Sequence, residues 1–84
     1  MNTYICEYGK ECDFVICENN APQKLIQVCY ELTKENTRRE AEALFDAMNF
    51  FKMQNGIILT FNQKDIILES GKRIDVIPVH EYQF

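Results

Sequence analysis

The chain has 84 residues, the size of a single domain with a small core. Hydrophobic residues make up 46% of it and charged residues 26%, a globular composition that argues against intrinsic disorder. The net charge of −4 disfavours strong non-specific binding to nucleic acid, which depends on Lys and Arg. No apolar run approaches the roughly 18 residues that span a bilayer, and the N-terminus lacks signal-peptide features. We expect one cytoplasmic domain over residues 1–84.

The four cysteines, at positions 6, 12, 17 and 29, contain no C-x-x-C pair. A four-cysteine zinc site uses ligand pairs about two to four residues apart, so this spacing does not predict one. Without a secretory signal, a disulfide framework is not indicated either. We expect reduced, mostly buried thiols and no cofactor.

The first half of the chain predicts three strands, at residues 3–8, 11–18 and 24–32. Gly9-Lys10 is a turn that joins the first two strands as a hairpin. In the second strand, Glu11 and Asp13 share one face, because side chains alternate along a strand.

The third strand is nearly apolar throughout except for Gln27. A continuous apolar run predicts a strand that is covered on both faces. A polar side chain in its middle must therefore find a partner, so we interpret Gln27 as a hydrogen-bonded interior amide.

Residues 33–53 predict one long helix. Its apolar side chains recur at helical spacing, at Ala41, Leu44, Phe45, Met48, Phe50 and Phe51. Thr37 and Glu40 fit a capping box at the start, and Asn55-Gly56 fits a C-terminal stop. The basic residues of the first turns predict two surface salt bridges, Glu35 with Arg39 and Arg38 with Glu42.

The second half predicts three more strands, at residues 56–61, 66–69 and 73–79. The helix between the third and fourth strands implies a crossover and a parallel pair, and Ser70-Gly71 implies a terminal hairpin. Pro78 argues against a fully paired central strand. The predicted fold is α/β (α+β), a mixed sheet in the order β-β-β-α-β-β-β with one helix. Because one helix covers only one face, the other face needs a further covering element.

Two runs carry a family resemblance. They are Gly9-Lys10-Glu11-Cys12-Asp13-Phe14-Val15-Ile16 and Leu25-Ile26-Gln27-Val28-Cys29-Tyr30-Glu31-Leu32. With the helix and strands that follow, they resemble the restriction-endonuclease-like PD-(D/E)XK nuclease fold. More closely, they look like the C-terminal DUF4143-type domain of AAA-type, archaeal ATPase-like proteins. The resemblance covers nearly the whole chain and implies an ATPase upstream in the parent protein, although these residues contain no P-loop.

The resemblance implies where catalytic groups belong. In the nuclease fold an Asp and a Glu on adjacent strands hold Mg²⁺, and a Lys two residues after the Glu helps to ready the attacking water. Asp13 matches the Asp, but Gln27 replaces the Glu and Cys29 replaces the Lys. A site with one formal charge fewer holds Mg²⁺ less well. The leading hypothesis is thus a catalytically degenerate module that binds a protein partner or the ATPase half of its own chain.

Other interpretations stay open. A divalent-metal nuclease could have relocated its ligands, using Asp13 with Glu11 or Glu7 to hold Mg²⁺. The chain could instead be a free-standing protein-binding domain that forms a homo-oligomer through its uncovered sheet face. In structural terms, Asp13 and Glu11 could simply be solvated, and Cys29 could be a small buried hydrophobe. His80 is interpreted as a surface residue.

Overall fold

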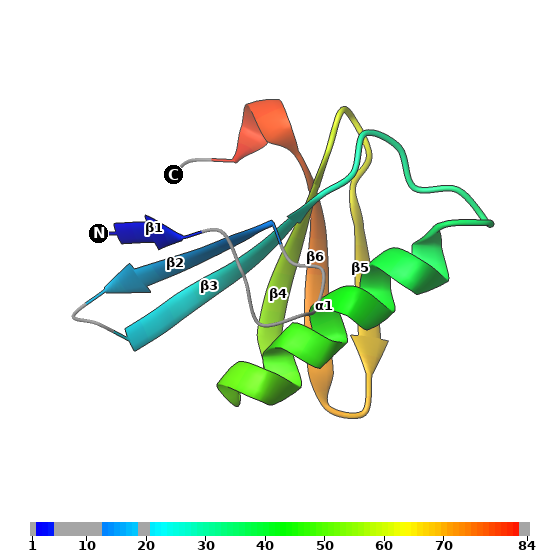
Figure 1. The fold of residues 1–84 in the computed structure, drawn as a ribbon. Helices are drawn as coiled ribbons and strands as arrows, with labels where there is room; N and C mark the ends of the chain where they lie inside the picture. Colours follow the sequence, from blue (N-terminus) through cyan, green and yellow to red (C-terminus); the bar gives the residue numbers. More distant parts are fainter. Residues whose placement is uncertain (1, 5–12, 19–20, 83–84) are drawn as a thin grey trace.

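The computed structural model describes residues 2–4, 13–18 and 21–82. It has an α+β fold, a mixed sheet with one α-helix (Figure 1), which confirms the predicted class. The strands are β1 (Asn2–Tyr4), β2 (Phe14–Glu18), β3 (Ala21–Val28), β4 (Asn55–Thr60), β5 (Asp65–Glu69) and β6 (Lys72–Pro78). The helix is α1 (Thr37–Phe51), and a short 3₁₀ turn, η1 (Val79–Glu81), follows the last strand.

The six strands form one sheet in the spatial order β1-β2-β3-β4-β6-β5. β3 and β4 are parallel across the helical crossover, and β5 and β6 form an antiparallel hairpin, as predicted. β1 and β2 are antiparallel, with Tyr4 opposite Val15. The turn predicted at Gly9-Lys10 lies outside the described residues.

The last strand was predicted not to be a fully paired central strand because of Pro78. β6 does lie inside the sheet, between β4 and β5, but its end at Ile77 and Pro78 pairs with β4 alone. Pro78 is compatible with this because it is the final residue of the strand. It pairs with Thr60 of β4, whereas β5 pairs with β6 only as far as Val76. At this position the missing N–H of proline leaves the rest of the ladder intact.

The predicted helix was too long at both ends. α1 ends at Phe51, and Lys52 adopts the left-handed conformation with φ 59°. The Met53 N–H then donates to the Met48 carbonyl at 2.8 Å, which closes the helix without a glycine. Asn55 and Gly56, predicted as the helix stop, instead begin β4.

The start of the helix also differs from the prediction. The third strand ends at Val28 rather than at residue 32, and residues 29–36, which we call the strap, lead to α1. Thr37 and Glu40 form no capping box. The reciprocal pair lies one turn earlier, where the Thr33 N–H donates to Asn36 Oδ1 at 2.8 Å and the Asn36 N–H donates to Thr33 Oγ1 at 3.2 Å. The Glu40 carboxylate therefore does not cap the helix and can accept a hydrogen bond from another element.

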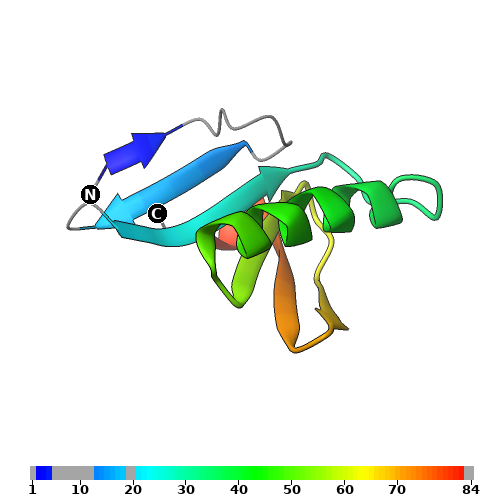
Figure 2. The same ribbon diagram turned by 60° about the horizontal axis from the view of Figure 1, so that its bottom comes forward.

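The core lies between α1 and one face of the sheet (Figures 1 and 2). Its fully buried side chains include Leu25, Leu44, Met48, Ile58 and Ile74. On the opposite face a smaller cluster of Ile16, Ile26 and Leu59 packs against Ile57, Ile77 and Tyr82. No helix among the described residues covers that opposite face. Large apolar side chains remain exposed there, such as Ile66 and Leu68.

Gly56 is where the helix comes very close to the sheet. A Cβ built at this position would lie 2.6 Å from Met48 Cε and 2.9 Å from Leu44 Cδ2. Both neighbours are fully buried core residues of α1. Glycine at position 56 therefore sets the distance between α1 and β4.

We expect Gly56→Ala to lower the free energy of unfolding by about 1–3 kcal/mol, because the added methyl group overpacks the contact with α1. Urea denaturation followed by circular dichroism measures this. Gly71→Asn is the control, since Gly71 has a φ of 79° with no atom near its missing Cβ, and Asn tolerates such a φ. Its effect should stay within about 1 kcal/mol. Wild-type stability in Gly56→Ala would contradict this account of the packing.

Candidate functional site: a hydrogen-bonded cluster between two strands and the helix

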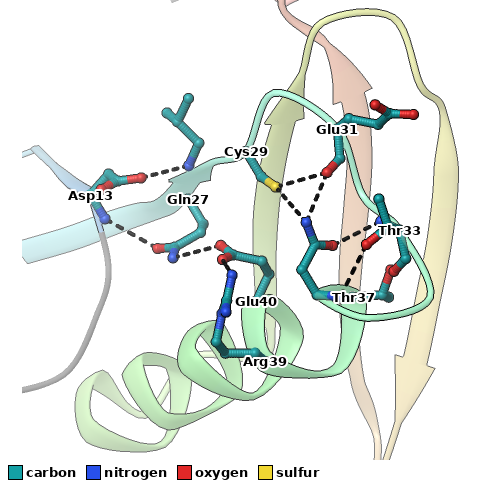
Figure 3. Close-up of polar contacts among 10 residues, drawn as sticks. Asp13, Gln27, Cys29, Glu31, Thr33, Thr37, Arg39 and Glu40 are labelled. Carbon is teal, nitrogen blue, oxygen red and sulfur yellow. Dashed lines mark hydrogen bonds and ion pairs between the residues drawn. The ribbon is translucent and has the colours of Figure 1, made fainter.

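The structure brings Asp13, Gln27 and Cys29 to one region, at the end where β3 passes into the strap (Figure 3). Main-chain pairing between β2 and β3 begins at Phe14 opposite Ile26, so Asp13 lies just beyond the ladder. Gln27 points from β3 toward the helix side. The two other acidic candidates, Glu7 and Glu11, lie outside the described residues.

Asp13 and Gln27 hold the two strands together where the main-chain ladder has stopped. The Val28 N–H donates to Asp13 Oδ2 at 2.7 Å, and the Asp13 N–H donates to Gln27 Oε1 at 3.3 Å. Each side chain thus satisfies a main-chain donor of the neighbouring segment. Asp13 is exposed whereas Gln27 is only 5% exposed, so the amide carries the buried part of this link.

The helix contributes a second carboxylate, that of Glu40, which the sequence pattern predicts to be part of a capping box. Gln27 Nε2 donates to Glu40 Oε1 at 3.0 Å, and Arg39 Nη2 lies 3.5 Å from Glu40 Oε2. The Glu40 side chain is only 12% exposed. Its position could have been inferred from spacing, because Glu40 precedes the buried Leu44 by four residues and therefore shares its helix face.

Cys29 follows β3 and is partly buried. Its Sγ donates to the Glu31 carbonyl at 3.3 Å and accepts a long contact of 3.8 Å from Asn36 Nδ2. Burial, and then the nearby Glu40 carboxylate, raise the pKa of the Cys29 thiol above its ordinary value. At neutral pH this position therefore presents a neutral thiol rather than a cation or a thiolate nucleophile.

The chemistry of the cluster follows from its partners. Both ends of the Gln27 amide are used, the oxygen by a main-chain donor and the nitrogen by a carboxylate. Across the part of the chain that the structure describes, no three His, Cys, Asp or Glu side chains converge closely enough to hold a metal ion. The arrangement of these described side chains is a network that connects β2, β3 and α1.

Two arginines at the start of α1 form ion pairs close to this cluster. Arg38 bonds Glu42 at 2.7 Å, as predicted, and also Glu69 of β5 at 2.7 Å. The hydrogen bond from Arg38 lowers the pKa of the Glu69 carboxyl. Arg39, predicted to pair with Glu35, contacts Glu40 instead. Glu40 is the next residue in the chain, and its side chain is largely buried on the side of the helix that faces the sheet.

Three further expectations concern surface and thiol residues. His80 is exposed, as predicted. Of the four cysteines, Cys17 is buried and free and Cys29 is half-buried and free, while Cys6 and Cys12 lie outside the described residues. Among the described residues, no helix has both the length and the apolar character needed to cross a membrane.

We predict that Gln27→Glu is destabilised by about 2–4 kcal/mol near pH 8, because it places a buried carboxylate against Glu40 and beside Asp13. The pKa of the introduced carboxyl is raised in the folded state. The variant's stability is therefore greatest below the unfolded-state pKa and is lost as pH rises through the folded-state pKa. Urea midpoints at pH 4.5 and pH 8 should show the deficit relative to wild type growing with pH.

Gln23→Glu is the matched control for this prediction. Gln23 lies on the same strand but is exposed, so the same chemical change should cost less than about 0.5 kcal/mol at either pH. A Gln27→Glu deficit that does not change with pH would contradict the close approach of the Gln27 amide to Glu40.

Comparison with known proteins gives one informative similarity. No family model matches the chain, and no solved structure matches it. The chain is similar to an uncharacterized protein of Methanocaldococcus jannaschii, MJ1544, with 33% identity over 81 residues. The match covers 89% of this chain but only 18% of the relative. The chain thus spans less than a fifth of the length of the curated relative that it matches.

Proposed function

We propose that the chain is a catalytically degenerate module of the restriction-endonuclease-like, PD-(D/E)XK class that serves as an interaction or regulatory domain of an AAA-type ATPase. Its partner would be another protein or the ATPase part of its own polypeptide. The observation that carries the proposal is that both ends of the Gln27 amide are hydrogen-bonded within the protein. By the resemblance, Gln27 occupies the position where a nuclease needs a metal-binding carboxylate. Its oxygen accepts from the Asp13 N–H and its nitrogen donates to Glu40.

The other nuclease positions support the same conclusion. Asp13 uses one carboxylate oxygen to accept from the Val28 N–H at 2.7 Å. Cys29 supplies a neutral thiol where the chemistry needs a positive charge that readies water. The Asp13 and Gln27 side chains thus connect the strands and the helix, and the Cys29 thiol contacts the strap.

Two observations support a role in binding proteins. The similarity to MJ1544 concerns a small fraction of that protein's length, which fits a module within a larger chain. Large apolar side chains are also exposed, Leu68 of β5 at 71% and, beyond the ends of β3 and β4, Tyr30 at 72% and Phe61 at 55%, whose rings stack with their centroids 5.1 Å apart. Exposed apolar side chains of this size are typical of protein contact surfaces when they gather into patches.

A magnesium-dependent nuclease is the second candidate, and one observation favours it. Glu40 approaches Gln27, so the described residues of this region include a second carboxylate besides Asp13. With Asp13, Glu40 would provide two charged ligands for Mg²⁺, and Glu11 or Glu7 would supply a third under the relocated-ligand hypothesis.

A cleavage assay separates the two candidates. We expect the purified chain, incubated with single-stranded DNA, duplex DNA or RNA and millimolar Mg²⁺ or Mn²⁺, to show no more cleavage than Asp13→Asn and Glu40→Gln. Circular dichroism should establish that both variants are folded. Cleavage by the wild-type chain that both substitutions abolish would overturn the proposal and establish the nuclease candidate.

Thermal unfolding with Mn²⁺ tests the degenerate-site interpretation itself. The Gln27→Glu variant restores the missing carboxylate beside Asp13, so we expect about 5 mM Mn²⁺ to raise its midpoint by at least about 4 °C. The wild-type chain and Gln23→Glu should shift by less than about 1 °C. A Gln27→Glu midpoint that Mn²⁺ leaves unchanged would contradict a metal site lost through this one residue.

A further inference from the structure

Beyond its first two residues, the strap (residues 29–36) is hydrogen-bonded to the sheet side of the protein by one side chain among the described residues, that of Gln63. The Leu32 N–H donates to Gln63 Oε1 at 2.6 Å, and Gln63 Nε2 donates to the Leu32 carbonyl at 2.9 Å. One amide side chain thus satisfies both main-chain groups of Leu32, as a neighbouring strand would. Before this point, the strap still pairs with the β4 end, through Cys29 with Leu59 and Tyr30 with Phe61.

The main chain of Gln63 is itself hydrogen-bonded to the end of β4. Its N–H donates to Thr60 Oγ1 at 2.9 Å, and Thr60 Oγ1 donates to the Gln63 carbonyl at 2.8 Å. Thr60 is 2% exposed at the end of β4. The fixed side of the clamp is therefore the sheet, and the side that can move is the strap.

Packing around the strap is incomplete, although Leu32 and Cys29 are partly buried against the core. A cavity of about 280 Å³ is lined by Leu32 and Thr37 on one side and by Gln63, Ile67 and Val76 on the other. On the side that borders the cavity, Leu32 has no packing partner. The two hydrogen bonds from Gln63, together with the contact of Leu32 with the core, therefore hold this segment in place.

The far half of the strap is hydrogen-bonded to the start of the helix. Thr33 and Asn36 bond each other reciprocally, and the Glu40 N–H donates to the Asn36 carbonyl at 3.0 Å. Asn36 Nδ2 also donates to the Glu31 carbonyl at 3.0 Å and reaches Cys29 Sγ at 3.8 Å. Asn36 thus connects the strap both to the first turn of α1, which carries Glu40, and to Cys29.

We propose that residues 31–36 of the strap are a conformational device that opens as one unit when the Gln63 clamp is released, while Cys29 and Tyr30 stay paired with the β4 end. Opening frees Asn36, uncovers the Cys29 thiol and loosens the first turn of α1, so that Glu40 withdraws from the Gln27 amide. The turn after β4 is in this way coupled to the Asp13–Gln27–Glu40 cluster. This inference does not rest on the proposed function.

Native-state alkylation tests the device, with Cys29 as the reporter and the buried Cys17 as the internal reference. Iodoacetamide labelling at fixed pH, mapped by peptide mass spectrometry, should show Cys29 in Gln63→Ala reacting about tenfold faster than in wild type, the effect of losing roughly 1.4 kcal/mol of clamp. The labelling of Cys17 should not change. Asn62→Ala, which alters the neighbouring exposed residue, should change neither rate.

Gln63→Glu provides the milder second variant. It keeps an acceptor for the Leu32 N–H but loses the donor to the Leu32 carbonyl, so its Cys29 rate should lie between those of wild type and Gln63→Ala. In hydrogen exchange, the Leu32 amide should lose protection in Gln63→Ala while the Ile58 and Leu59 amides of β4 keep theirs. The proposal is overturned by an unchanged Cys29 rate in both variants, or by Cys17 and Cys29 accelerating in parallel, which would mean global unfolding.

Discussion

A buried amide must find partners for both of its ends, and in this protein that requirement connects three elements. Gln27 is 5% exposed, with its oxygen on the Asp13 N–H and its nitrogen on the Glu40 carboxylate. Leaving either end unpaired in the interior would cost about 1–3 kcal/mol. The position of α1 over the sheet and the continuation of β2 along β3 therefore both depend on one side chain. The same requirement keeps the amide oxygen engaged within the protein.

Different kinds of contact hold α1 against the sheet along its length. Near its C-terminal half, Gly56 permits Leu44 and Met48 to lie almost directly on β4. Toward its N-terminus, Arg38 bonds Glu69 of β5, and Glu40 bonds Gln27 of β3. Exposed ion pairs contribute little to stability, so we assign the seating mainly to the apolar contacts and the buried Glu40–Gln27 bond.

The two faces of the sheet differ in a way that bears on function. The face under α1 contains the larger core, whereas the opposite face has a small buried cluster and the exposed apolar side chains Ile66 and Leu68 of β5. A polar network that is satisfied internally and an apolar surface that is not covered by a helix suit a domain that binds other proteins. This combination is why we prefer the interaction module over the nuclease.

The sequence alone determined the fold class, the parallel crossover and the terminal hairpin, because alternation, helical periodicity and turn residues are local properties. It also showed that Gln27 needs a partner. Only the tertiary structure identified that partner: Glu40 matched a capping pattern just as well, and the cap formed at Thr33 and Asn36 instead. The interior position of β6, and the inclusion of Asn55 and Gly56 in β4, were likewise decided by contacts between distant segments. Such contacts leave no periodic trace in a single sequence, since local preferences yield whenever packing and buried hydrogen bonds outweigh them.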